Sequence, residues 1–325
     1  MTSSSVGAVF LLSFCCMIPT SVQAASSAND LIRDAYGLKQ HGDFKSAIAI
    51  LEPIADSTDE ELPAEQKGIA WNILGSAYQD LHHLDQARSC YEHSINLLRP
   101  IVAAQAQFAS AVDNLGSVEL EFGRFDNSER LRRKARQIYT RLGDHAGVAR
   151  TSSNLAVVAL RQGADGEARR YIRTALQESA RAAGLDDDDI AGMLSVRGRL
   201  ALIDRNPKAA LAFYQEAFER WTQLHGAASY QAGIGLSLRS EAHRLAGDLT
   251  DASCDLRNAL SIFSSTLGSN SSLYWKTSLQ LARVLRDQGL SDEAQAIEEK
   301  AANALHDNRD YQSCVACSIT AQAFR

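Results

Sequence analysis

Small residues recur along the chain at a fixed spacing and mark a repeating unit of two helices. One column holds Ala35, Gly75, Gly116, Ala156, Gly198, Ser240 and Ala282. Twelve residues further on stand Ala47, Ala87, Ser128, Ala168, Ala210, Ala252 and Ala294. Two antiparallel helices approach closely only where the facing residues lack bulk, and larger residues then fill the grooves on either side. The pattern therefore predicts seven helix pairs, which start near residues 28, 68, 109, 149, 191, 233 and 275.

Two further columns fit this arrangement. Between the helices of most units stands a glycine at one shared offset, as in Gly42, Gly123, Gly163, Gly247 and Gly289. Glycine suits the left-handed turn that ends a helix. In the second unit, His82 and His83 occupy this turn, where glycine would be usual. The alanines of the last column are expected to let each second helix pack on the next unit: Ala135, Ala175, Ala217, Ala259 and Ala301.

The second unit carries the most detailed version of the pattern. It reads WNILGSAY at residues 71–78, followed by Ala87, Tyr91 and Pro100. This resembles the tetratricopeptide pattern W-x2-L-G-x2-Y with its following alanine, aromatic residue and proline. The period of 40 to 42 residues, with NLG at 114–116 and NLA at 154–156, resembles the kinesin-light-chain type of this repeat. The resemblance spans residues 25–307 and implies an all-α, right-handed superhelical solenoid of helix-turn-helix repeats.

The first 24 residues differ from the repeats and are expected to form a signal peptide. An apolar run covers residues 6–18, which is too short to span a bilayer as a settled helix. Val22 and Ala24 are small residues at the positions that a signal peptidase requires. We therefore expect cleavage after Ala24 and an exported protein, periplasmic or secreted. No second apolar run follows, so no integral membrane segment is expected after cleavage.

Other fates of this segment stay open at the level of sequence. The region ahead of the apolar run has no Lys or Arg, so an uncleaved anchor is the main alternative to cleavage. Lipoprotein processing at Cys15 is disfavoured because the bulky Phe14 stands where a small residue is required.

Four cysteines remain after the expected cleavage. Cys90 and Cys254 lie several repeats apart and are expected to be small, packed apolar residues. Cys314 and Cys317 lie in residues 308–325, which are expected to cap the last repeat. In an oxidising compartment the two could form a local disulfide, with two free thiols as the alternative. A redox motif would need a strand–helix unit, and haem attachment would need a histidine where Ser318 stands.

The tetratricopeptide resemblance implies that the first helices line a concave groove that binds a peptide. By position, the groove residues of units two to four would be Asn72, Ser76, Asn114, Arg150, Asn154 and Arg161. The family's carboxylate clamp uses Lys, Asn, Asn, Lys and Arg to hold a peptide's C-terminus. Asn114 and Arg150 match this set in kind, whereas Asn72, Ser76 and Asn154 depart from it. Most of the cationic grip is therefore missing, which puts recognition of a chain terminus in doubt.

What remains suits recognition of a peptide backbone. An asparagine amide both donates and accepts, so it can pair with the N–H and C=O groups of an extended peptide. The alternative is that Asn114 and Asn154 only satisfy neighbouring helix ends. The sequence therefore predicts a protein or peptide partner and leaves its identity open.

Charged residues suggest two further interpretations. Basic residues cluster on the second helices of units three and four: Arg130, Arg132, Arg133, Lys134, Arg136, Arg169, Arg170 and Arg173. Most of them are expected to face the convex side, where they would form either a solvated face balanced by nearby carboxylates or an arginine belt that binds an anionic polymer or membrane. The acidic run 186–189 precedes the fifth unit and is expected to cap its first helix, since calcium loops need alternating ligands and a turn glycine.

Catalytic motifs are missing from the sequence. His82 and His83 lack the spacing of metal ligands, and no nucleophile elbow, phosphate loop or dinucleotide fingerprint occurs. The formal net charge of −6 argues against nucleic acid as a partner. The sequence therefore favours a binding scaffold without cofactor or metal over an enzyme, and a self-assembling structural element is a further alternative.

Overall fold

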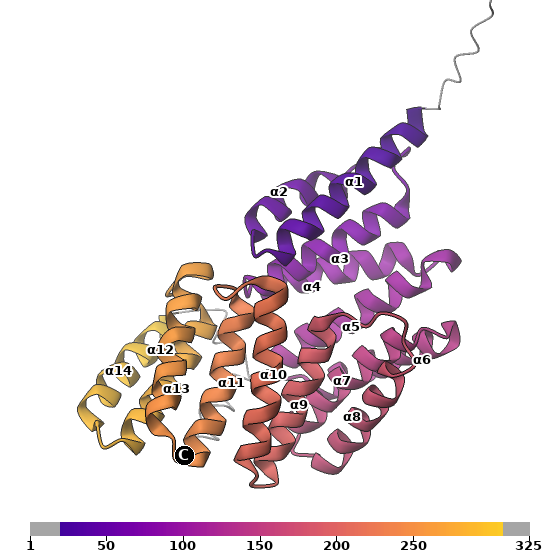
Figure 1. Cartoon of the computed structure of the whole chain (residues 1–325). Helices are drawn as coiled ribbons and strands as arrows, with labels where there is room; N and C mark the ends of the chain where they lie inside the picture. Colours follow the sequence, from indigo (N-terminus) through magenta and orange to yellow (C-terminus); the bar gives the residue numbers. More distant parts are fainter. Residues whose placement is uncertain (1–19, 308–325) are drawn as a thin grey trace, which may run out of the picture.

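The computed structural model describes residues 20–307, which form fourteen α-helices in seven antiparallel pairs (Figure 1). The first four pairs are α1 (Thr20–Gln40) with α2 (Phe44–Ala55), α3 (Ala64–Asp80) with α4 (Leu84–Leu98), α5 (Gln105–Glu121) with α6 (Phe125–Leu142), and α7 (His145–Arg161) with α8 (Asp165–Ser179). The others are α9 (Asp187–Ile203) with α10 (Pro207–His225), α11 (Tyr230–Ala246) with α12 (Leu249–Thr266), and α13 (Ser272–Asp287) with α14 (Ser291–Asp307). A short 3₁₀ turn, η1 (Val102–Ala104), precedes α5.

The first helices begin ahead of the starts expected from the small-residue pattern, in most units by about one turn. Side-chain caps set several of these starts. Asp144, Asp186, Ser229 and Ser271 each accept a hydrogen bond from the backbone N–H three residues later, which satisfies a donor that the helix leaves free. The capping role expected for the acidic run 186–189 is thereby confirmed.

Two of the expected segments lie at the ends of the chain. Residues 1–19 of the expected signal peptide lie outside the described residues, and Thr20–Ala24 open α1. The expected capping segment 308–325, with Cys314 and Cys317, also lies outside them. None of the helices within residues 20–307 is both long and apolar enough to cross a membrane.

The small residues lie where each pair of helices crosses. All fourteen members of the first two columns are buried, and the five alanines of the last column are 0% exposed. Because each unit repeats the same close crossing, the expectation of helix pairs packed through small residues is confirmed.

In most units, the residue sixteen positions after the first small residue is large where that small residue is glycine and smaller where it is alanine or serine. Gly75 packs on the ring of Tyr91, and Gly198 packs on the ring of Tyr214. Where the column holds alanine or serine instead, three of the four units carry a buried Leu or Ile sixteen positions later: Leu51, Ile172 and Leu256. In the last unit this position holds Glu298. A smaller residue on the first helix is therefore matched by a larger side chain on the second helix, as close packing requires.

The turn between the helices of each pair adopts the left-handed conformation in all seven described units. Five units use glycine, with φ from 72° to 92°. His82 (φ 63°) and Arg205 (φ 55°) hold the same conformation with a side chain present. A residue other than glycine is strained there because its Cβ approaches the following carbonyl.

Replacing Arg205 with glycine is expected to raise the free energy of unfolding by about 0.5–1 kcal/mol, since the left-handed strain exceeds the entropic cost of glycine. Urea denaturation measures this change. Arg205→Ala is the matched control, because it removes the same exposed side chain but keeps the Cβ. An equal gain in Arg205→Ala would show that the side chain, and not the backbone, carries the effect.

The helix contacts give the array its curvature. The first helices α1, α3, α5, α7, α9 and α11 contact one another in succession, whereas each second helix packs mainly on the first helices of its own and the next unit. The first helices therefore form the inner wall of the superhelix and the second helices its outer face (Figure 1).

The two described cysteines differ. Cys90 is buried on α4, and burial raises the pKa of its thiol to about 12. Cys254 is exposed, so its expected packing is wrong. The buried face of α12 carries Ala252, Leu256, Ala259 and Phe263, and Cys254 lies two residues past Ala252, which turns it to the opposite side of the helix.

Candidate functional site

The inner wall carries a repeated hydrogen bond between successive first helices. Asn114 Nδ2 donates to Asn72 Oδ1 over 3.0 Å, and Asn154 Nδ2 donates to Asp113 Oδ2 over 2.8 Å. The donor stands two residues before the small column in its own unit, and the acceptor three residues before it in the preceding unit. We call these two contacts the amide rungs. Their spacing of 42 and 41 residues matches the period of the repeat.

The amide rungs account for three of the residues predicted to line the groove. Asn72, Asn114 and Asn154 are each partly buried on the inner wall, and Asn72 also donates to Ser110 Oγ over 3.3 Å. Their partners lie on neighbouring first helices rather than at helix ends. An amide carries two N–H donors and an acceptor oxygen, so each asparagine keeps capacity for a further contact.

The other predicted groove residues lie on the same first helices but are not joined to the rungs. Ser76 is half-buried on α3, and Arg161 is exposed at the end of α7. Arg150 contacts Asp189 at 3.3 Å, and its guanidinium lies 5.8 Å from the centre of the Tyr139 ring. Burial raises the pKa of Asp189 to about 7, although Arg150 acts to lower it. Arg150 therefore links α7 to the acidic start of α9.

A buried charge pair lies directly behind the second rung. Arg132 and Asp113 are each 3% exposed, and Arg132 Nη1 lies 3.9 Å from Asp113 Oδ1. Arg132 also donates to Ser117 Oγ over 2.9 Å and to Ser128 Oγ over 3.2 Å. The assignment of Arg132 to an outward arginine belt is therefore wrong.

Spacing in the sequence explains where Arg132 points. It lies sixteen residues after Gly116, and the same offset separates Gly75 from Tyr91 and Gly198 from Tyr214. The position faces the first helix of its own unit, and Gly116 makes room for the stem of Arg132. The sixteen-residue offset from Gly116 thus indicates that Arg132 is buried, although the neighbouring arginines suggest an exposed basic cluster.

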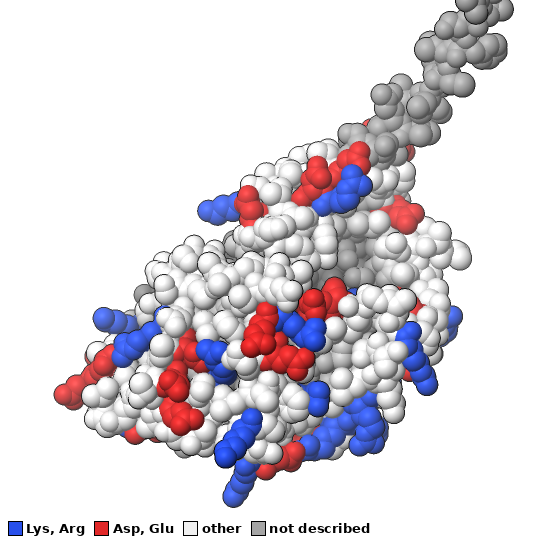
Figure 2. Space-filling model, in the orientation of Figure 1, with Lys and Arg blue, Asp and Glu red and all other residues white. Residues whose placement is uncertain are grey.

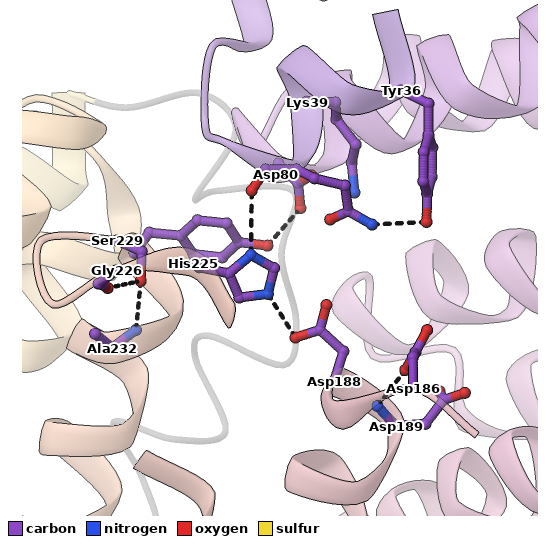
Figure 3. Close-up of polar contacts among 12 residues, drawn as sticks. Tyr36, Lys39, Asp80, Asp186, Asp188, Asp189, His225, Gly226, Ser229 and Ala232 are labelled. Atoms are coloured by element: carbon purple, nitrogen blue, oxygen red, sulfur yellow. Dashed lines mark hydrogen bonds and ion pairs between the residues drawn. The ribbon is translucent and has the colours of Figure 1, made fainter. Parts of the chain in front are cut away.

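The junction of α10 and α11 contacts the ends of α1 and α3. Around the junction of α10 and α11, His225 contacts the backbone oxygen of Gln40 at 3.1 Å, and Tyr230 donates to Asp80 Oδ1 over 3.0 Å. Lys39 pairs with the same Asp80 at 3.0 Å. Figure 3 shows His225 between the end of α1 and Asp188 at the start of α9. These contacts, which we call the closing contact, join residues 185 and 150 positions apart.

Apolar packing supports the closing contact. The rings of Phe44 and Tyr230 meet edge to face with their centres 5.9 Å apart. Burial, together with the charge of Asp80, raises the pKa of Tyr230 well above its usual value. The phenol therefore stays protonated and donates to Asp80. The closing contact therefore joins the first two units to the fifth and sixth units.

The protonation of His225 controls part of the closing contact. Nδ1 faces the Gln40 oxygen and Nε2 lies 2.7 Å from Asp188 Oδ1, so both nitrogens donate only in the imidazolium form. Burial lowers the pKa of His225, and the charge of Lys39 lowers it as well. The hydrogen bond and charge of Asp188, together with the Gln40 oxygen, raise the pKa by more than this. The net pKa lies above the usual 6.5.

A histidine with a raised folded-state pKa stabilises fully below its unfolded pKa of about 6.5, and this stabilisation is lost as the pH rises through the folded value. Replacing His225 with glutamine is therefore expected to cost about 1–3 kcal/mol near pH 6 and less near pH 8. Urea denaturation at both pH values tests this. The exposed His41, replaced in the same way, serves as the control. The interpretation fails if the cost of the His225 change is the same at both pH values.

Asp189 is expected to add to the same trend in the unmodified protein. Its raised pKa of about 7 means that its contribution is fully present below an unfolded value of 3.8 and is lost as the pH approaches 7. The comparison with the His225 variant separates the two effects, because Asp189 is present in both proteins.

Comparisons with known proteins agree with the architecture. One tetratricopeptide repeat profile matches residues 107–177, and another matches residues 69–97. No curated protein matches the chain in sequence. These matches fall on units two to four, which also carry the amide rungs.

Several crystal structures share the fold at low sequence identity. A Rap protein complexed with competence and sporulation factor has a TM-score of 0.65 at 13% identity, with 88% of this chain and 78% of that chain covered. The apo form of RapI has a TM-score of 0.57 at 10% identity, with 87% and 100% covered. A STAND protein from Pyrococcus horikoshii with a tetratricopeptide repeat sensor has a TM-score of 0.52 at 15% identity, with 88% and 44% covered.

Three findings point to one family. The described residues form helix pairs packed through small residues, repeat profiles match the central units, and a protein that carries such repeats shares the fold. The chain is a tetratricopeptide repeat protein.

Proposed function

We propose that this chain is an exported scaffold that binds a peptide or protein segment along its inner wall. The amide rungs carry the proposal. They place partly exposed amides at the repeat period, and each amide keeps donors or acceptors that an extended backbone could use. The similarly folded Rap protein, seen in complex with competence and sporulation factor, supports a binding role for such an array. The proposed role is non-catalytic, as is typical of scaffolds.

The experiment is affinity capture of the mature chain from the envelope fraction, compared with the double variant Asn72→Ala/Asn114→Ala. The two asparagines are replaced together because their side chains bond to each other. Removing both leaves neither side chain of this rung without its hydrogen-bond partner. Two lost hydrogen bonds should weaken the complex by about 1–3 kcal/mol, or roughly 5- to 150-fold in Kd.

The control is Asn96→Ala/Asn258→Ala, which changes two exposed asparagines on the outer helices α4 and α12. The proposal requires that the control variant keep the partner while the inner-wall variant loses it. Equal retention by both folded variants would move the binding site away from the rungs. Release of the same ligand from all forms by moderate salt would favour the arginine-rich outer face, because exposed charges are screened over about 8–10 Å.

Export is part of the proposal and has its own test. Cleavage after Ala24 would give a mature chain that begins at Ala25, within α1. Edman sequencing of protein from the envelope and culture fractions identifies this end. An intact N-terminus in the membrane fraction would instead favour the uncleaved anchor.

The redox state of the C-terminal cysteines is tested on the same material. We propose that Cys314 and Cys317 form a local disulfide, as the oxidising compartment would allow. Alkylation with and without prior reduction, followed by mass spectrometry of the C-terminal peptide, distinguishes the disulfide from two free thiols.

A further inference from the structure

A groove with a volume of about 610 Å³ lies on the outer face, between the second helices α6 and α8 and beside the start of α7. Among the described residues, four arginines and a single carboxylate, that of Glu178, line it. The arginines are Arg133, Arg136, Arg170 and Arg181. In Figure 2, Lys and Arg side chains gather at the lower right, where Figure 1 places α8. The groove is large enough for a small organic molecule.

Tyr171 lies in this groove with an unsatisfied hydroxyl. Tyr171 is only 4% exposed, and its hydroxyl oxygen is buried without a hydrogen-bond partner among residues 20–307. Buried polar atoms are nearly always hydrogen-bonded, so such an atom calls for an explanation. Three guanidinium groups surround the ring, those of Arg136, Arg170 and Arg133, at 5.4, 5.5 and 6.0 Å from its centre. A phenol among cations is suited to donate to an anionic oxygen.

The arginines also keep binding capacity. Arg136 is half-buried and has no carboxylate partner among residues 20–307. The other three each pair with a glutamate three or four residues away in the sequence, and their side chains are 50–66% exposed. Exposed pairs of this kind are worth about 0–1 kcal/mol, so a ligand can compete with them. Glu178 is itself occupied by His145 at 2.6 Å and Arg181 at 3.0 Å.

We infer that the groove between α6 and α8 binds the phosphate group of a small soluble molecule, which accepts a hydrogen bond from Tyr171 and pairs with Arg136. A phosphate fits this set better than a carboxylate does. It offers three or more oxygens and up to two negative charges, so it can engage the phenol and more than one guanidinium together. This site is separate from the inner wall and does not depend on the function proposed for it.

The test uses inorganic phosphate as the probe and isothermal titration calorimetry or NMR shift perturbation as the measurement. Tyr171→Phe keeps the ring and removes only the hydroxyl, and it is expected to weaken phosphate binding about tenfold. Without phosphate the same variant should be as stable as the unmodified protein or more so, since the hydroxyl has no partner to lose. Arg136→Gln is expected to weaken binding by about tenfold or more.

Arg173→Gln is the matched control, because it removes one exposed arginine from α8 outside the groove. It should leave phosphate binding within about twofold of the unmodified protein, as expected for a screened surface charge. The inference is overturned if Tyr171→Phe binds phosphate normally, or if Arg173→Gln weakens binding as much as Arg136→Gln does. Binding to phosphatidylglycerol vesicles without any binding of soluble phosphate would also overturn it, in favour of a membrane surface.

Discussion

Replacing Asp113 with alanine is expected to lower the free energy of unfolding by about 3–5 kcal/mol, the usual cost of leaving one member of a buried ion pair uncompensated. Arg132 is 3% exposed, and Asp113 is the carboxylate nearest to its Nη1. Burial lowers the pKa of Arg132, and the charge of Asp113, followed by that of Glu121, counters this. The same substitution removes the acceptor of the second amide rung. Urea denaturation followed by circular dichroism measures the loss.

Glu129→Ala provides the matched control. Glu129 pairs with Arg133 on the outer side of α6, the helix that carries Arg132. The side chains of Glu129 and Arg133 are 23% and 50% exposed. Breaking this pair is expected to cost at most about 1 kcal/mol. Equal losses in the two variants would mean that the Asp113–Arg132 pair is not effectively buried.

A double variant separates the buried charge from the packing. Unit two holds Asn72 and Tyr91 at the positions that Asp113 and Arg132 occupy in unit three. Asp113→Asn/Arg132→Tyr copies that set, and its stability is expected to equal or exceed that of the unmodified protein, because a buried ion pair rarely outperforms well-packed side chains. A loss as large as that of Asp113→Ala would show that the charges themselves stabilise this unit.

Replacing Gly198 with alanine is expected to destabilise the protein by about 1–3 kcal/mol through overpacking. A Cβ at this position would lie 2.7 Å from both Cδ1 and Cζ of Tyr214, a ring that is only 1% exposed. Moving the ring aside would disturb the packing of α10 against α9 and α11. The change is measured as a shift in the midpoint of urea unfolding.

Gly192→Ala in the same helix is the control, because no side chain of residues 20–307 lies within 4 Å of a Cβ there. It is expected to raise stability by about 0.5–1 kcal/mol, since alanine is the better helix former. The two glycine variants should therefore change the free energy of unfolding in opposite directions. The pairing of sizes also predicts that Gly198→Ala/Tyr214→Ile, which copies Ala156 and Ile172 of unit four, recovers part of the loss. Destabilisation by both single alanines would contradict the close crossing at Gly198.

The sequence predicted the residues that define each unit. The small columns, such as Ala156 with Ala168, are buried as expected, and the shared glycines hold the left-handed turn. The positions of the groove asparagines on the inner wall also follow from this register. Whether a partner contacts them stays a prediction, which the double asparagine variant tests.

Other features escaped sequence analysis for identifiable reasons. Arg132 was hidden by neighbouring arginines of the same helix, although its offset from Gly116 marked it as inward-facing. The rungs could not be predicted as bonds, because they depend on how far one first helix is rotated against the next. The exposure of Cys254 follows from the face of α12, which a residue type that is usually buried does not reveal.

By itself, the sequence determined the unit: two helices, their close crossing, the turn between them and the period at which they repeat. It could do so because each of these depends on contacts within a unit or with the next one, and such contacts leave a periodic pattern. Only the tertiary structure decided how the units curve, and therefore that His225 meets Gln40 and that Tyr230 meets Asp80. Curvature is the sum of small rotations over several units, so residues brought together in this way share no spacing that a sequence pattern could show. The groove around Tyr171 arises in the same way, from the angle between two second helices that no single unit contains.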